Sequence, residues 1–229
     1  MSINPKLKKM ISVTIVMILV YVSATFILYD TFLTPNVDKI TGFAVTSVNV
    51  SESPGAICNF NLYEGANLIS FHCIQGMYPL EFTLENISQD YKAIFSYSPS
   101  DAKDPWKSYN PNLPLWATQD LSMIYDSGGY WIIMNKNATY YLNGIVNRNS
   151  QTSLNAGWNL IGYPRGTSKT PNMAFSSLDG HYDMVLEYKK ENNTWYYYAP
   201  GNASSTLKMI DPDYGYWIRM TSNYTWVYP

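Results

Sequence analysis

The chain has 229 residues, of which 46% are hydrophobic, 16% aromatic and only 14% charged. This composition excludes a disordered polar chain, and the length allows one or two domains with cores of their own. A net charge of −2 and a pI near 5.6 leave no basic surface typical of nucleic-acid binding, so no nucleic-acid partner is expected.

Residues 10–29 form an uncharged apolar run without Gly or Pro, long enough to cross a bilayer as a helix. Lys6, Lys8 and Lys9 lie in the tail formed by residues 1–9, and Asp30 follows the run. The positive-inside rule therefore predicts a single-pass cell-membrane protein with a cytoplasmic N-terminus and an extracellular C-terminal region. Two alternatives stay open: a signal peptide cleaved before Thr25, and a pilin-type N-terminal helix.

Residues 30–53 are expected to form a linker, and the rest of the chain contains an internal repeat. Residues 62–71 match residues 154–163 at an offset of 92, and residues 129–132 match residues 215–218 at an offset of 86. A steadily shrinking offset is what loop-length differences between two copies of one module produce. We therefore predict copy 1 over residues 54–147 and copy 2 over residues 148–229.

Each copy is predicted to begin with a β-hairpin. Gly65-Ala66 suits a two-residue type II′ turn, which pairs residues whose numbers sum to 131. This register places one set of side chains on a core face: Leu62 with Ile69, Phe60 with Phe71, Cys58 with Cys73. It places another set on a wet face: Asn59, Asn61, Ser70, His72. In copy 2 the same register pairs Leu154 with Ile161 and Thr152 with Tyr163.

The predicted hairpin brings Cys58 and Cys73 opposite each other, with Cα atoms about 5.5 Å apart, which a disulfide tolerates. A disulfide is expected outside the cell. Two buried thiols are the alternative. Copy 2 carries Ser150 and Arg165 at the equivalent positions, so the module does not require a bridge.

Apolar residues at helical spacing then predict one short helix in each copy, over residues 79–87 and 171–178. Further strands are predicted at residues 92–98 and 184–189, at Trp106 and residues 195–198, and at the Gly-Tyr-Trp-Ile segments. The predicted fold class is mainly β: an N-terminal transmembrane helix followed by two tandem antiparallel β modules, each with one short helix.

The segments Gly-Trp-Asn-Leu-Ile (residues 157–161) and Gly-Tyr-Trp-Ile (residues 215–218) resemble a β-rich repeat module of archaeal and bacterial cell-surface, S-layer-like proteins. The resemblance covers residues 57–229, and Ala66 of copy 1 departs from it where Trp is expected. It implies a structural or adhesive role with no catalytic site to carry over. The segment Ile-Thr-Gly-Phe-Ala-Val (residues 40–45) is also similar to archaeal surface proteins.

Motifs for catalysis are missing from the sequence, so we expect neither an enzyme nor a cofactor. His72 and His181 have no second ligand at a spacing typical of metal sites, and no metal is predicted. The Asp211-Pro212-Asp213 segment could hold calcium, but an acidic turn that caps its own backbone is favoured.

Two sets of residues are candidate surface sites. Six Asn-x-Ser/Thr motifs predict glycosylation at Asn49, Asn86, Asn137, Asn192, Asn202 and Asn223. The aromatic residues that recur in both copies are expected in the core: Trp106, Trp131, Trp195, Trp217. Others are candidates for exposed contacts with glycans or a partner protein: Trp116, Tyr196, Tyr198, Trp226.

Together these features predict a membrane-anchored extracellular structural or adhesive protein that is not an enzyme. A lectin-like carbohydrate-binding module and a pilin-like filament subunit are the alternatives. Residues 10–29 would anchor the chain in the membrane. Cell-surface glycans or proteins are candidate partners, and the sequence leaves the oligomeric state open.

Overall fold

A computed structural model describes residues 56–114, 116–117, 119–145 and 151–229, all within one compact unit, Val50–Pro229. The predicted tail, transmembrane segment and linker, residues 1–53, lie outside the described residues. Among the residues described, no helix is long and apolar enough to span a membrane.

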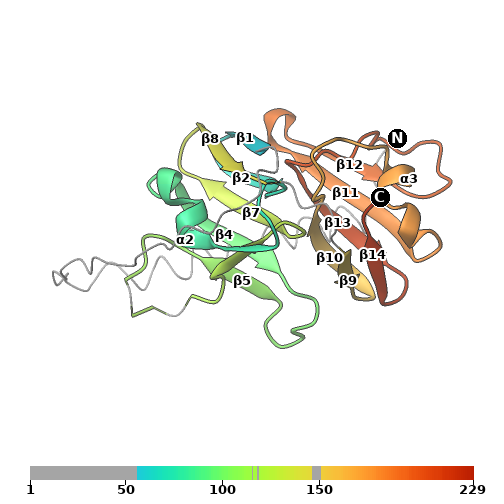
Figure 1. Cartoon of the computed structure of the whole chain (residues 1–229), viewed down its shortest axis with the longest axis horizontal. Helices are drawn as coiled ribbons and strands as arrows, with labels where there is room; N and C mark the ends of the chain where they lie inside the picture. The colour runs from blue at the N-terminus through green and yellow to red at the C-terminus, as the bar shows by residue number, and fades with distance from the viewer. Residues whose placement is uncertain (1–55, 115, 118, 146–150) are drawn as a thin grey trace, which may run out of the picture. The chain divides into compact units, whose positions relative to one another are not determined.

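The described chain is mainly β, with antiparallel sheets and short helices, as predicted (Figure 1). Each copy contains one four-stranded sheet, and the strand order is the same in both. In copy 1 the order is β2 (Gly65–Ser70), β7 (Gly129–Met134), β4 (Tyr91–Tyr97), β5 (Trp106–Tyr109). In copy 2 it is β10 (Gly157–Gly162), β13 (Gly215–Met220), β11 (Tyr182–Lys189), β12 (Thr194–Tyr198).

A two-stranded sheet accompanies each four-stranded sheet. These pairs are β1 (Ala56–Leu62) with β8 (Ala138–Gly144), and β9 (Gln151–Leu154) with β14 (Tyr224–Val227). Copy 1 also pairs β3 (Met77–Pro79) with β6 (Met123–Tyr125). The helices are α2 (Leu80–Thr83), η1 (Glu85–Ile87), α3 (Pro171–Ala174), η2 (Ser176–Leu178) and η3 (Lys190–Asn192). Both copies thus have the predicted short helical segment in the same place.

The predicted hairpin pairing is wrong in both copies. β1 pairs with β8 and β2 pairs with β7, while β9 pairs with β14 and β10 with β13. The chain turns a corner between two sheets where a hairpin was expected. The predicted core face is nevertheless confirmed, because all six of its side chains are at most 6% exposed, and the rings of Phe60 and Phe71 lie 5.3 Å apart.

An asparagine explains the corner. The Asn67 side chain accepts a hydrogen bond from the Tyr63 N–H (2.9 Å) and donates to the carbonyls of Tyr63 (2.6 Å) and Gly65 (3.0 Å). The amide thus satisfies backbone groups of Tyr63 and Gly65 and holds this segment in its turned conformation. Asn159 makes the same three bonds in copy 2, to Asn155 and Gly157.

Each copy has its own hydrophobic core. The cluster in copy 1 includes Phe71, Ile94 and Tyr130, and the cluster in copy 2 includes Phe175, Val185 and Trp226. Two copies with separate cores can each keep their fold while a second set of contacts joins them. Those joining contacts define the site described next.

Candidate functional site

The two copies meet through reciprocal backbone contacts. The Ser70 N–H donates to the Asp213 carbonyl (3.1 Å), and the Gly162 N–H donates to the Ser127 carbonyl (2.8 Å). Ser70 and Gly162 are equivalent in the repeat, as are Ser127 and Asp213. Each copy therefore gives the other the contact that it receives, as in a two-fold symmetric dimer. Two isolated bridges repeat this relation: Ile69 with Tyr214, and Gly128 with Ile161.

The glycine of each Gly-Tyr-Trp-Ile segment allows this close approach. A Cβ atom on Gly129 would lie 2.6 Å from the Ile161 carbonyl oxygen, and one on Gly215 would lie 2.8 Å from that of Ile69. Both oxygens belong to the backbone of the other copy, which cannot rotate away as a side chain can. The repeated glycine is therefore explained by the contact between copies.

The repeated tryptophans lie on the same interface. The Trp217 ring of copy 2 lies 5.2 Å from Tyr97 and 5.8 Å from Trp106 of copy 1. Reciprocally, Trp131 of copy 1 lies 5.6 Å from Tyr188 and 6.0 Å from Trp195. Trp131 and Trp217 are buried, at 5% and 9% exposure, but they belong to neither core cluster and pack against the other copy.

Trp106 and Trp195 are only partly buried, and they too belong to neither core cluster. The expectation that these two residues lie in the core is wrong. They recur because the interface between the copies, rather than either core, needs an aromatic side chain at these positions.

The same interface corrects the predicted wet face. Asn59 and Asn61 are exposed, but Ser70 and His72 are buried, at 0% and 6% exposure. The Ser70 hydroxyl donates to the Pro212 carbonyl of copy 2 at 2.6 Å. The part of the predicted wet face formed by Ser70 and His72 is thus covered by the other copy.

On one side of this interface the copies leave a groove of about 630 Å³. Its walls are the end of β4 and the following turn, the segment around β6, and strands β9 and β10. Serines are frequent in the wall from copy 1: Ser96, Ser98, Ser100, Ser122, Ser127. Small side chains at these positions leave the space open.

We call the side with the groove the open side and the opposite side of the interface the closed side. On the closed side, the equivalent positions are occupied by larger, mostly charged residues. At an offset of 91, Ser96, Ser98 and Ser100 correspond to Glu187, Lys189 and Glu191. At an offset of 86, the open side has three smaller residues, Ser122, Ser127 and Gly128, where the closed side has Lys208, Asp213 and Tyr214. The groove therefore exists on one side because the two copies differ in sequence there.

Charged contacts hold the closed side together. The Lys189 Nζ lies 3.7 Å from Glu187 Oε1, 3.5 Å from Asp211 Oδ2 and 4.3 Å from the centre of the Tyr214 ring. The Tyr214 hydroxyl donates to Glu191 Oε1 at 2.9 Å. These contacts fill the region that is a groove on the other side.

Glu187 is an unusual member of this cluster because it is fully buried, at 0% exposure. Tyr216 donates a hydrogen bond to its Oε1 at 3.3 Å, but its buried Oε2 has no hydrogen-bond partner among the described residues. Burial raises the pKa of Glu187 to about 7, against the opposing effect of Lys189. The carboxyl group thus changes charge near neutral pH.

Lys107 is surrounded by acidic residues at one end of the groove. Its Nζ lies 2.8 Å from Asp101 Oδ2, and 3.8 Å from both Asp104 and Asp120. The hydrogen bond from Lys107 holds the pKa of Asp101 below its usual value. The positive charge that the groove receives from Lys107 is therefore already neutralised.

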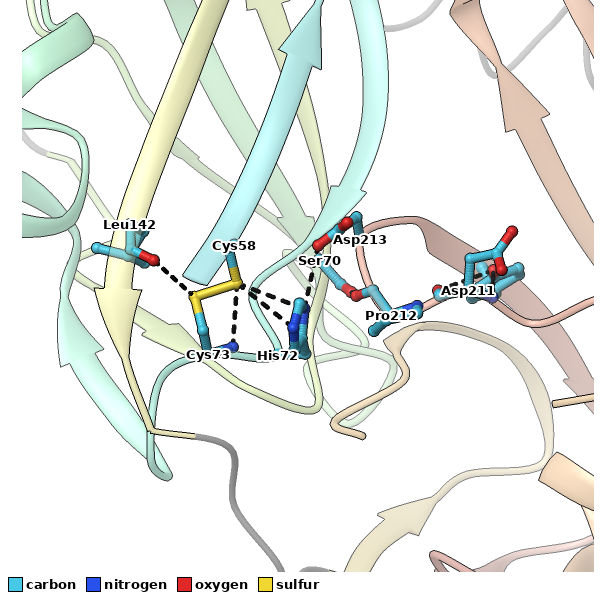
Figure 2. A network of polar contacts seen from close by, with 9 residues as sticks. Cys58, Ser70, His72, Cys73, Leu142, Asp211, Pro212 and Asp213 are labelled. Carbon is cyan, nitrogen blue, oxygen red and sulfur yellow. Dashed lines mark hydrogen bonds and ion pairs between the residues drawn. A yellow bond between two sulfur atoms is a disulfide. The ribbon is translucent and has the colours of Figure 1, made fainter. Parts of the chain in front are cut away.

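A disulfide lies at the edge of the closed side (Figure 2). Cys58 and Cys73 are bonded, with Cα atoms 5.8 Å apart, as predicted, although through the corner and not through a hairpin. His72 Nδ1 lies 3.4 Å from the Cys58 sulfur and 3.1 Å from Asp213 Oδ1 of copy 2. Sequence spacing could not reveal this cluster, because Asp213 is remote from His72 along the chain.

The cluster of Cys58, His72 and Asp213 has three side chains of types that bind metals, within 4.8 Å of one another. The Cys58 sulfur is held in the disulfide, however, so no thiolate is offered. Of the two carboxylates considered for calcium, Asp211 lies against Lys189 while Asp213 lies against His72. Because the two carboxylates contact different side chains, Lys189 and His72, the interpretation of this segment as an acidic turn is favoured.

Five of the six predicted glycosylation sites lie in the described region, and all five are exposed: Asn86, Asn137, Asn192, Asn202, Asn223. Asn49 lies outside it. Asn137 Oδ1 accepts a hydrogen bond from the Glu64 N–H (2.8 Å), and Asn223 Oδ1 accepts one from Ala156 (2.7 Å). In both copies these asparagines therefore also hold the corner in place.

The candidate aromatic contacts have mixed outcomes. Trp116 is 73% exposed, while Tyr196 and Tyr198 are half-buried and pack against the core of copy 2. Trp226 is 0% exposed, and its Nε1 donates to the Ala174 carbonyl at 3.0 Å. The prediction that Trp226 is an exposed contact is wrong, because β14 turns this side chain into the core.

Searches against known protein families, curated proteins and solved structures find no match to this chain. The site is therefore interpreted from its own geometry.

Proposed function

We propose that this chain is a non-catalytic structural or adhesive protein of a prokaryotic, archaeal cell surface. Residues 10–29 would anchor it in the membrane, and residues 56–229 would lie outside the cell. The Cys58–Cys73 disulfide is the observation that carries this proposal. Disulfides of this kind form and persist outside the cytoplasm. The lysines before residues 10–29 also favour an extracellular location for the residues that follow that segment.

The exposed asparagines support an extracellular location. Glycans attach to the Nδ2 atom, whereas the corner contacts of Asn137 and Asn223 use Oδ1. Modification is therefore compatible with the fold at the two positions that both copies share. Paired copies with separate cores, joined by reciprocal contacts, also suit a surface component that must keep its shape.

The proposal assigns no reaction to the protein. In the described region, Cys58 and His72 lie close enough to suggest a nucleophile and a base, but the sulfur is already bonded to Cys73. A disulfide sulfur has no proton to give to the histidine, so this pair supports stability and not nucleophilic catalysis.

Protease accessibility tests the proposed topology. The full chain carries one epitope tag at each end, and intact cells are treated with a protease that cannot enter them. The C-terminal tag should be lost and the N-terminal tag kept, while both are lost after lysis. Protection of the C-terminal tag in intact cells would refute the proposal. N-terminal sequencing of the same protein separates the anchored form from the cleaved and pilin-like forms.

A further inference from the structure

The groove between the copies has the dimensions of a ligand site. Its volume of about 630 Å³ falls within the range of roughly 300–1,000 Å³ that is typical of small-molecule sites. It lies where two packed units meet, which is a frequent location for such sites. The opposite side shows that the same interface can instead be closed by Lys189 and Tyr214.

The walls of the groove present polar groups that have no partner within the described protein. Ser122 and Ser153 supply hydroxyls and Asn155 supplies an amide, and none of these side chains makes a hydrogen bond to another described residue. Each hydroxyl can both donate and accept, and so can the amide. Such groups on a concave surface suit a ligand that carries several hydroxyls.

Aromatic side chains supply the second element of recognition. Tyr125 lines the groove and is 48% exposed, so part of its ring is open to a ligand. Tyr97 lines the same groove and is half-buried. An aromatic ring gives a large contact area with little loss of side-chain entropy, which suits the apolar C–H face of a sugar ring.

The charges in the groove favour a neutral ligand. Among the described lining residues, Lys107 supplies the positive charge and Asp120 the negative charge, and their side chains lie 3.8 Å apart. Asp101 also pairs with Lys107, at 2.8 Å. A phosphate or a uronic acid would find no free cation on these walls and would meet the Asp120 carboxylate.

We propose that this groove binds a neutral carbohydrate. Ser122, Ser153 and Asn155 would exchange hydrogen bonds with its hydroxyls, and one sugar ring would lie against Tyr125. The proposal deepens the adhesive role above by naming its ligand class, and it rests on that role only for its biological meaning. The groove itself does not require a membrane anchor.

The test uses the full chain in a mild detergent that has no sugar head group. Neutral di- to tetrasaccharides of glucose, galactose, mannose and N-acetylglucosamine are screened by saturation-transfer NMR, and affinities are measured by calorimetry. Oligogalacturonate and inorganic phosphate form the anionic arm. We expect at least one neutral saccharide to bind and both anions to fail.

The double substitution Ser98→Lys and Ser100→Glu gives the groove the residues found at Lys189 and Glu191. It should weaken saccharide binding at least about tenfold, and Tyr125→Ala should do the same by removing the ring. Ser168→Lys introduces a lysine at an exposed serine outside the lining, and it should leave the affinity unchanged.

The proposal is overturned if no neutral saccharide binds, if the groove variants bind as the wild type does, or if only the anions bind. Near-UV circular dichroism confirms that each variant is folded. Protease accessibility measures the topology separately, so a failed carbohydrate site and a failed membrane location give different results.

Discussion

Replacing Glu187 by Gln should remove a large part of the pH dependence of stability. The pKa of Glu187 rises from its ordinary value of 4.5 to about 7 because folding buries the carboxyl group. Between these values the folded state binds more protons than the unfolded state, so the free energy of unfolding falls as pH rises. At 1.36 kcal/mol per pH unit, the loss approaches about 3 kcal/mol above pH 7.

This effect is measured by urea unfolding of a fragment spanning residues 50–229, with tryptophan fluorescence as the readout. The free energy of unfolding is determined at several pH values between 4 and 9. Glu187→Gln should be about as stable as the wild type at pH 4 and more stable at pH 8. Glu85→Gln removes an exposed negative charge and serves as the control. Equal pH profiles for the wild type and Glu187→Gln would refute the reasoning, as would wild-type stability that rises between pH 5 and pH 7.

Three further predictions concern the corner, the interface and the disulfide. Asn159→Ala should lower the free energy of unfolding by about 2–3 kcal/mol in urea titrations, because three hydrogen bonds to buried or turn backbone are lost. Gly215→Ala should cost about 1–3 kcal/mol and change the near-UV circular dichroism of the interface tryptophans, since its Cβ meets the Ile69 carbonyl. Reducing Cys58–Cys73 should cost about 3 kcal/mol on the chain-entropy model, and the reductant should have no effect on the Cys58→Ser, Cys73→Ser variant.

The predicted core face of β1 and β2 was right although the predicted pairing was wrong, and the reason is general. Alternation along a strand determines which side chains share a face, but not which strand lies beside it. Phe60 and Phe71 therefore face one core whether their strands pair or meet at a corner. The Gly65-Ala66 turn signal is local. Asn67, by contrast, bonds the backbone of Tyr63 and Gly65 from a position inside the next strand.

The repeat itself contained a signal that would have placed Trp226 correctly. At the offset of 86, Trp226 corresponds to Tyr140, and both side chains are buried, at 0% and 3% exposure. An aromatic residue at one position in both copies indicates a shared structural role. The same reasoning fails for Trp106 and Trp195, because recurrence cannot distinguish a core from an interface between the copies.

A pairing of two copies through reciprocal contacts explains why sequence alone could identify the scaffold but not the candidate site. The contacts that both copies need involve recurring residues, such as Gly129 and Gly215, and repeats reveal them. The groove depends instead on positions where the copies differ, such as Ser98 against Lys189. A comparison of the two sequences gives such differences no meaning until the fold shows that the two positions lie on opposite sides of one pseudo-two-fold interface. Because the shared contacts hold the pair together, one side can be closed by charge pairs while the other stays open to a ligand.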